Sequence, residues 1–210
     1  MKYIIMAGGP ATRWRNYQNT TKHLIKIGNE NLLERIVRQL QENGCEEIFI
    51  ISDNPLYEVP GSTRLPLIYD YKLYNMFYKK YLNEECVYLY GDTWYNDDII
   101  RTIVNQKTEN IDFFGTTESI VGIKVVNHNS FKYYVDDMVK NDIDRAGWAL
   151  YRRINKIKDD EEIRVCDNLV LVDEEEIANV NDEGDFNMLL QKIIIILLNN
   201  QKKNNQNVIK

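Results

Sequence analysis

Apolar and polar positions alternate along this chain in two periods, and each period predicts a different kind of element. Short continuous apolar runs predict buried strands, while apolar residues at helical spacing over residues 31–43, followed by Gly44, predict a helix with a C-terminal stop. Asn96 can cap a further helix, with acidic residues in its first turn. The predicted strands are residues 2–7, 47–52, 66–69, 86–90, 111–116, 120–127, 164–172 and 177–180. The predicted helices are residues 31–43, 72–82, 96–107, 130–140, 145–155 and 185–200.

This alternation of strands and helices predicts an α/β fold: a single Rossmann-like layered domain with a mostly parallel central sheet flanked by helices. The length of 210 residues suits one domain, which we place at residues 1–200. Residues 201–210 are polar and are expected to form a disordered tail. In such sheets, ligands bind at the carboxyl ends of the strands.

The loop after the first strand has the composition of an anion site. Gly8 and Gly9 let the backbone approach a ligand closely. The segment from Thr12 to Ile27 carries four cations and no carboxylate, and its polarity predicts that it is exposed. Open amide groups beside fixed cations suit a polyphosphate, although a plain strand-to-helix turn would also use two glycines.

Three motifs in this part of the chain resemble the nucleotidyltransferases that activate phosphorylated sugars and small alcohols, of the MobA-like and cytidylyltransferase-like type. The motifs are Ala7-Gly8-Gly9-Pro10-Ala11-Thr12-Arg13, Lys22-His23-Leu24 and Leu32-Leu33-Glu34-Arg35. The family normally has Gly where this chain has Ala11 and Pro where it has Thr21. The resemblance implies a GT-A-like domain and a nucleoside triphosphate as substrate.

The resemblance also implies roles for individual residues. Lys22 would neutralise charge on the reacting phosphate, and Arg13 would grip the β- and γ-phosphates that leave as pyrophosphate. The implied nucleotide-binding residues are Ala7, Gly8, Gly9, Thr12, Arg13, Lys22 and Asp92.

Two segments are candidates for holding Mg²⁺, the cofactor that the resemblance implies. Asp92 follows an apolar strand and Gly91, where a carboxylate can bind the ion, although it can also close an Asx turn. Residues 180–186 resemble a second family motif, in which the first Asp or Asn reaches the metal. That position is Asn181, with Asp182 as the alternative ligand, while a helix N-cap would explain the same acidic residues.

A basic, aromatic segment is the candidate acceptor site. Arg145, Trp148 and Arg152 can bind the second, phosphorylated substrate, and an amphipathic surface helix would explain them equally well. The nearby Asp142-Ile143-Asp144 raises a glycosyltransferase alternative, but its charged surroundings favour a solvated turn.

Composition excludes several other classes of protein. The net charge is −6, which argues against a nucleic-acid partner, although residues 1–40 are locally basic. Of these cations, Arg35 and Arg38 are expected only to solvate a helix face. Three widely spaced cysteines without a Cys-x-x-Cys pair argue against a disulfide framework or zinc site and favour a reducing cytoplasm. The apolar run Ile193–Leu198 is too short to span a membrane.

The expected reaction is transfer of a nucleoside monophosphate from a triphosphate, with CTP or UTP favoured, to a sugar phosphate, phospho-alcohol or phospho-amino acid. Two alternatives stay open: a glycosyltransferase on a similar fold, and an inactive nucleotide-binding relative. The departures at Ala11, Thr21 and Asn181 keep the inactive relative open. The sequence leaves the oligomeric state undetermined.

Overall fold

A seven-stranded sheet forms the centre of the computed structural model, which describes residues 1–9, 11–67, 73–77, 79–143 and 146–208. Its strand order is β10–β8–β9–β6–β1–β4–β5, in which β9 runs antiparallel to both neighbours and the other pairs are parallel. This arrangement confirms the predicted mostly parallel sheet. The strands are β1 (Lys2–Met6), β4 (Ile48–Ile51), β5 (Thr63–Leu65), β6 (Cys86–Tyr90), β8 (Ile111–Gly115), β9 (Ile120–Val125) and β10 (Leu169–Leu171).

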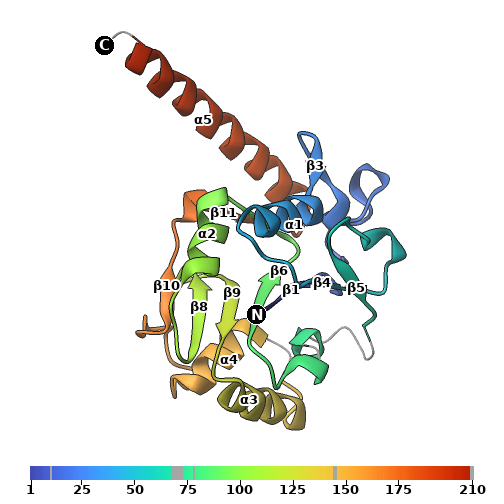
Figure 1. Ribbon diagram of the computed structural model, residues 1–210, viewed down its shortest axis with the longest axis vertical. Coiled ribbons are helices and arrows are strands. Elements are labelled where there is room, and N and C mark those ends of the chain that lie inside the picture. Colours follow the sequence, from blue (N-terminus) through green and yellow to red (C-terminus); the bar gives the residue numbers. More distant parts are fainter. Residues whose placement is uncertain (10, 68–72, 78, 144–145, 209–210) are drawn as a thin grey trace.

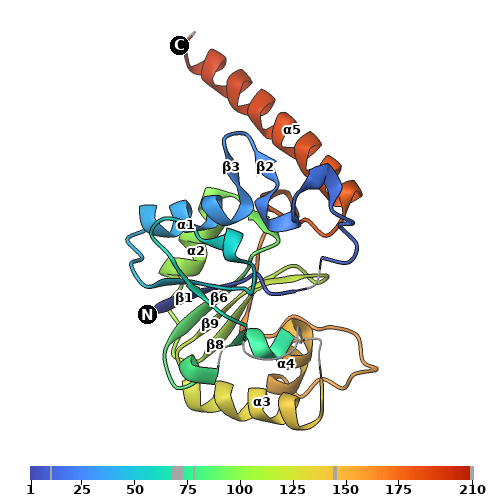
Figure 2. The same ribbon diagram turned by 90° about the vertical axis from the view of Figure 1, so that its right-hand side faces the viewer.

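Helices cover both faces of this sheet (Figures 1 and 2). One face carries α1 (Leu32–Glu42) and α2 (Asp97–Asn105), and the other carries α3 (His128–Lys140) and α4 (Ala146–Ile154). Alternate residues of β1 therefore enter two cores. Tyr3 and Ile5 pack with residues of α1 and α2, while Ile4 and Met6 pack with residues of α3 and α4.

Two short antiparallel pairs lie outside the main sheet, and of their four strands the sequence predicted only residues 177–180. One is the hairpin of β2 (Lys26–Ile27) and β3 (Glu30–Asn31). The other pairs β7 (Thr93–Tyr95) with β11 (Ile177–Asn179), two segments far apart in the sequence. The other three strands have two or three residues each, which is too short a pattern for period-2 alternation to be read.

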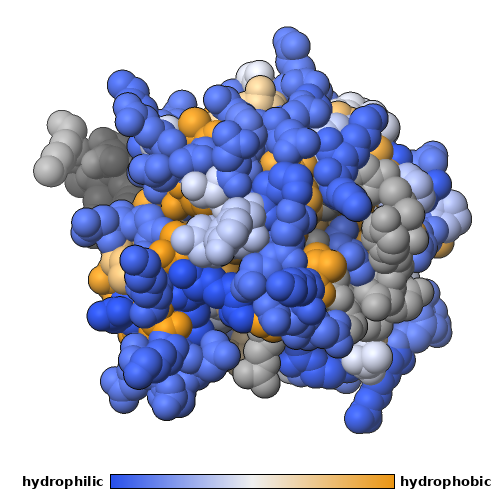
Figure 3. Space-filling view, turned by 90° about the horizontal axis from the view of Figure 1, so that it is seen from below, coloured by the Kyte–Doolittle hydropathy of each residue, from blue (hydrophilic) through white to orange (hydrophobic). Residues whose placement is uncertain are grey.

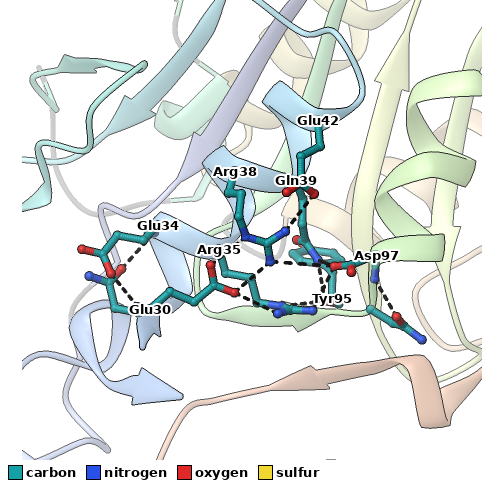
Figure 4. A network of polar contacts seen from close by, with 10 residues as sticks. Glu30, Glu34, Arg35, Arg38, Gln39, Glu42, Tyr95 and Asp97 are labelled. Carbon is teal, nitrogen blue, oxygen red and sulfur yellow. Dashed lines mark hydrogen bonds and ion pairs between the residues drawn. The ribbon is translucent and has the colours of Figure 1, made fainter. Parts of the chain in front are cut away.

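Polar contacts fasten α1 to its surroundings, as Figure 4 shows. Arg35 bonds to Glu30, to Asp97 and to the carbonyl oxygen of Tyr95, and Arg38 bonds to Glu30. These ion pairs hold the pKa of the Glu30 carboxyl below its usual value. Both arginines are thus occupied in joining α1 to the hairpin and to α2, rather than merely solvating a helix face.

Two predictions between β4 and β6 were wrong. The strand predicted at 66–69 lies earlier, at Thr63–Leu65, because Pro66 cannot donate to a ladder; residues 68–69 lie outside the described residues. The helix predicted at 72–82 is replaced by 3₁₀ turns at Leu73–Phe77 and Lys79–Tyr81, with residues 72 and 78 outside the described part. Met76, Phe77 and Tyr81 all enter one core from these turns.

The last helix is longer than predicted. Helix α5 runs from Glu183 to Val208 and projects away from the body (Figures 1 and 2), so most of the segment expected to be a disordered tail is helical. Asn, Gln and Lys are compatible with helix when a preceding anchored segment has already nucleated it. The boundary of a single domain at residue 200 stays a prediction. Within the described residues, we find no helix with the length and apolar character to cross a bilayer.

Candidate functional site

Strands β1 and β6 are neighbours and end together, which brings their following loops to one edge of the sheet. The register pairs Met6 with Tyr90, so Ala7-Gly8 and Gly91-Asp92 leave the sheet side by side. A Cβ at Gly91 would lie 3.0 Å from the Cβ of Ala7 and 3.0 Å from the Met6 carbonyl oxygen. Glycine is therefore required at residue 91 for the two loops to approach this closely.

Lys22 and Asp92 meet at this edge, although 70 residues separate them. The Lys22 Nζ donates to Asp92 Oδ2 at 2.5 Å, with 9% of the lysine side chain and 21% of the aspartate side chain exposed. The prediction that this loop is exposed was wrong for Lys22, which is buried and forms this ion pair. A largely buried cation beside a carboxylate is an arrangement that can exchange partners when a phosphate and a metal ion enter.

His23 follows Lys22 in the chain and is turned into the protein interior. Its ring is buried, and Nδ1 lies 3.0 Å from the Tyr57 hydroxyl. Burial lowers the pKa of His23 to about 4. The negative charge of Asp92 opposes this shift, and the positive charge of Lys22 adds to it. The imidazole is therefore neutral at pH 7 and packs as a core residue next to the catalytic candidate.

We expect the burial of His23 to appear in the pH dependence of stability. Its folded pKa lies below its unfolded value of 6.5, so its stabilising contribution is complete above that value and is lost as the pH falls toward 4. Between pH 7 and pH 5, this loss should reach about 2 kcal/mol in the free energy of unfolding. Urea titrations of wild type and His23→Gln, each referred to its own value at pH 7, measure it. The same slope in both proteins would contradict the assignment.

A cavity of about 950 Å³ opens next to Asp92. Among the candidates from the sequence, Asp92, Asn181, Trp148 and Arg152 all line it. The pairing of β7 with β11 is what brings Asn181 here. It places Val180 opposite Asp92, and the Val180 amide donates to the Asp92 carbonyl oxygen at 2.7 Å.

Sequence reasoning missed a chain of hydrogen bonds at this cavity, which Ser119 and Asn179 both line. Thr93 Oγ1 donates to Asn179 Oδ1 at 2.7 Å, and Asn179 Nδ2 donates to Ser119 Oγ at 2.7 Å. This chain joins the segments of Asp92 and Asn181 to the loop before β9. The available signal was the polar Asn179 at the end of an otherwise apolar short strand.

Asn181 and Asp182 have different surroundings. Asp182 Oδ1 accepts from the Asp185 amide at 3.0 Å, which is the N-cap bond of α5. The Asn181 amide donates to Asp185 Oδ2 at 2.9 Å, while its side chain belongs to the residues that line the cavity. The structure therefore brings Asn181 to Asp92 and uses Asp182 to begin the helix.

Arg13 lies at a second, smaller hollow. This hollow of about 440 Å³ is lined by Arg13, Trp14, Arg15, Tyr17, Asp182, Glu183 and Gly184. Arg13 and Thr12 are exposed, while Trp14 is buried and its indole N–H donates to the Thr20 carbonyl oxygen at 2.7 Å. The loop is thus anchored by its tryptophan, with its arginine left at the surface.

Helix α4 contributes one wall of the large cavity. Trp148 Nε1 donates to the Glu118 carbonyl oxygen at 3.2 Å. Arg152 donates to the carbonyl oxygens of Lys158 and Glu161, so its guanidinium fastens the loop after α4. Arg145, the third acceptor candidate, lies outside the described residues. Among the described residues, no group of three or more His, Cys, Asp and Glu side chains converges in a way that could hold a metal.

Comparisons with known proteins agree with the motifs. Residues 3–76 match the MobA-like NTP transferase domain. A CTP:phosphocholine cytidylyltransferase from Streptococcus pneumoniae is 16% identical over 91% of this chain and 98% of its own, with a TM-score of 0.65. A Bacillus anthracis protein assigned as a glucose-1-phosphate thymidylyltransferase is 15% identical over 90% and 93%, with a TM-score of 0.65. A nucleotidyl transferase from Methanothermobacter is 11% identical over 93% and 98%, with a TM-score of 0.67.

The search of curated proteins gives no match. At these identities, the solved structures establish the fold, and the sequence match covers the segment that contains Gly8, Gly9 and Lys22. Residues 3–76 of this chain therefore match the MobA-like NTP transferase domain, and nine-tenths of the chain has a fold that solved nucleotidyltransferases share.

Proposed function

We propose that this protein is a Mg²⁺-dependent nucleotidyltransferase that joins a nucleoside monophosphate to a small phosphorylated acceptor and releases pyrophosphate. The observation that carries the proposal is the contact of 2.5 Å between Lys22 and Asp92 at the carboxyl edge of the sheet. It places an ammonium group and a carboxylate beside the Gly8-Gly9 loop, where a triphosphate and its counter-ion need opposite charges. A cytoplasmic location stays a prediction.

The nucleotide would bind along the loop after β1. The amide groups of Gly8 and Gly9 can approach its phosphates, with Thr12 beside them. The Ala7 amide already donates to the Ile51 carbonyl oxygen at 3.1 Å, so Ala7 can only line the site. Arg13 is exposed, so its guanidinium can turn toward the β- and γ-phosphates. CTP or UTP stays the favoured triphosphate.

Asp92 and Asn181 would hold Mg²⁺. A carboxylate and an amide oxygen are the hard ligands that this ion takes, and it commonly completes its shell with waters and substrate phosphates. Their shared position at the cavity fits the ion, since Asp92 Oδ2 is already within 2.5 Å of a cation in the form of the Lys22 ammonium. When bound, the ion supplies charge neutralisation at the triphosphate.

The chemistry needs positioning and charge neutralisation rather than a general base. An acceptor phosphate oxygen, already anionic at pH 7, attacks the α-phosphorus in line. The bond from the α-phosphorus to the bridging oxygen breaks, and pyrophosphate leaves with its electron pair. Lys22 stabilises negative charge at the reacting phosphate and Arg13 stabilises the leaving pyrophosphate, while the cavity holds the acceptor.

The lining of the cavity favours one kind of acceptor. Tyr90 and Trp148 are aromatic walls, and the acidic Glu118 and Asp159 stand at the same cavity. Burial, together with the charge of Asp92, raises the pKa of Tyr90 and keeps the phenol neutral. Because Arg152 already bonds to backbone carbonyls, we favour an acceptor whose end remote from the phosphate is neutral or cationic, such as a phosphorylated amino alcohol.

Pyrophosphate release tests the function. The purified protein is given each of the four triphosphates with Mg²⁺ and, in turn, phosphocholine, phosphoserine or glucose 1-phosphate. We expect release that needs both substrates. A nucleotide-sugar donor consumed without pyrophosphate would indicate the glycosyltransferase alternative, and nucleotide binding by thermal shift without release would indicate an inactive relative.

Trp148 should determine acceptor affinity. Trp148→Ala removes an aromatic wall of the cavity. Because contact with such a ring contributes ~1–2 kcal/mol to binding, we expect KM for the acceptor to rise by roughly 10-fold. KM for the triphosphate should stay unchanged, which distinguishes this effect from unfolding. Trp94→Phe, at a tryptophan outside the cavity, is the control. Equal changes in both KM values would contradict the assignment.

Asn181 and Asp182 should give opposite signatures. Asn181→Ala should raise the Mg²⁺ concentration needed for half-maximal turnover, while Asn181→Asp should keep or lower it by supplying a charged ligand. Asp182→Ala should leave this concentration unchanged and lower the free energy of unfolding by roughly 0.5–2 kcal/mol, because it removes the N-cap of α5. Metal titration and denaturant melts separate the two, and a shifted metal requirement in Asp182→Ala alone would move the ligand by one residue.

A further inference from the structure

Helix α5 carries large apolar side chains that face away from the rest of the protein. Their exposed fractions run from 52% to 70%, although each belongs to a residue type that prefers burial. We call them the outer face of α5: Met188, Ile194, Ile195, Leu197 and Leu198. In Figures 1 and 2, the helix extends from the body, and none of the described elements packs against its far side.

The opposite face of the same helix is already used. Phe186 and Leu189 are buried, and Ile193 and Ile196 pack partly against the same cluster, which includes Trp14. An amphipathic surface helix needs one apolar stripe to attach it, whereas a segment that is apolar all round is normally buried on all sides. Over Ile193–Leu198, α5 is apolar on every side, so one side is attached to the body and the other lacks a cover among the described residues.

The outer face is also free of charge. Between Phe186 and Asn199, the charged residue is Lys192, and its Nζ donates to the carbonyl oxygens of Glu174 and Ile177 at 2.6 Å and 2.9 Å. This lysine therefore points to the body. The exposed neighbours of the apolar side chains are amides, such as Gln191 and Asn199.

We propose that the outer face of α5 is a dimerisation surface that pairs with the same face of a second copy of this chain. A two-fold interface sets each patch against itself, so a charged patch would repel its copy, whereas this uncharged one does not. Five apolar side chains at roughly 100 Å² each give about 500 Å² per copy. The total of about 1,000 Å² reaches the lower bound for a biological interface and suits a weak, reversible dimer.

A lipid surface fits this face less well. Helices that lie on membranes pair an apolar face with a polar face rich in Lys and Arg, whereas the opposite face of α5 is attached to the protein.

The far end of the molecule offers no equal patch among its visible residues. Figure 3 shows it as mostly hydrophilic, with hydrophobic residues in small scattered groups.

Sedimentation velocity over a range of protein concentrations tests the proposal. We expect wild type to change from monomer to dimer in the micromolar range and Ile195→Lys/Leu198→Lys to stay monomeric with an unchanged melting temperature. Leu56→Lys/Val139→Lys, at two apolar residues exposed elsewhere, is the matched control and should dimerise like wild type. If the lysine variant does not fold, Ile195→Gln/Leu198→Gln replaces it.

Three results would overturn the proposal. They are a wild type that stays monomeric to millimolar concentration, a folded helix variant that still dimerises, and a control that loses the dimer equally. Co-sedimentation of monomeric wild type with vesicles of phosphatidylserine and phosphatidylcholine would instead assign the face to a lipid surface. None of these measurements depends on nucleotidyl transfer.

Discussion

Replacing Lys22 with alanine should lower the rate of nucleotidyl transfer by ~100-fold or more. The reason is that the substitution removes the buried ammonium group that meets Asp92 at the edge of the sheet. The effect should lie in kcat at saturating triphosphate and acceptor, because the lost interaction strengthens as charge develops on the reacting phosphates. Pyrophosphate release under these conditions measures it.

Lys26→Ala is the matched control for this variant. Lys26 is an exposed cation four residues along, in the β2–β3 hairpin, and its loss should leave turnover nearly unchanged. Since Lys22→Ala leaves the half-buried Asp92 carboxylate without its partner, thermal melts must accompany the kinetics. A folded Lys22→Ala protein with turnover near that of wild type would remove Lys22 from the mechanism.

Asp92→Asn should weaken the response to Mg²⁺. The amide keeps the shape of the side chain and can still accept a hydrogen bond from Lys22, but it loses the negative charge. Loss of a group that only supports a metal ligand weakens metal binding by ~10–100-fold. We therefore expect the Mg²⁺ concentration for half-maximal turnover to rise by at least this factor. Because the largely buried Lys22 ammonium loses its counter-charge, melts in a chelator must accompany the titration, and a variant that is folded at the assay temperature separates the metal effect from a loss of structure.

Asp98→Asn is the control for charge alone, because Asp98 is exposed on α2 and pairs with Arg101. It should titrate with Mg²⁺ like wild type. Turnover without any divalent ion, or an unchanged requirement in Asp92→Asn, would return Asp92 to the role of a turn former.

Much of the central sheet could be predicted because strands such as β1 and β6 are continuous apolar runs buried on both faces. Their parallel pairing also followed from the alternation of strands and helices, and so did the meeting of the Gly8-Gly9 loop with Asp92. The match of residues 3–76 to an NTP transferase domain agrees with the resemblance that the motifs carry.

The details that complete the site depend on contacts between segments distant in the sequence. Nothing near Thr93 indicates that it pairs with Asn179, because the β7–β11 ladder is too short to leave a pattern. The choice between Asn181 and Asp182 rests likewise on one capping bond to Asp185. The burial of Lys22 could not be foreseen either, since a polar loop looks exposed until its ion-pair partner is known.

The positions of the three tryptophans allow intrinsic fluorescence to report on each substrate separately. Trp14 anchors the loop that would hold the triphosphate, while Trp148 forms a wall of the cavity that would hold the acceptor. With Trp94 and one of these two replaced by phenylalanine, the emission of the remaining indole reports on a single substrate. Each half of the reaction can then be followed by stopped-flow fluorescence without a labelled ligand, in the order in which the two substrates arrive.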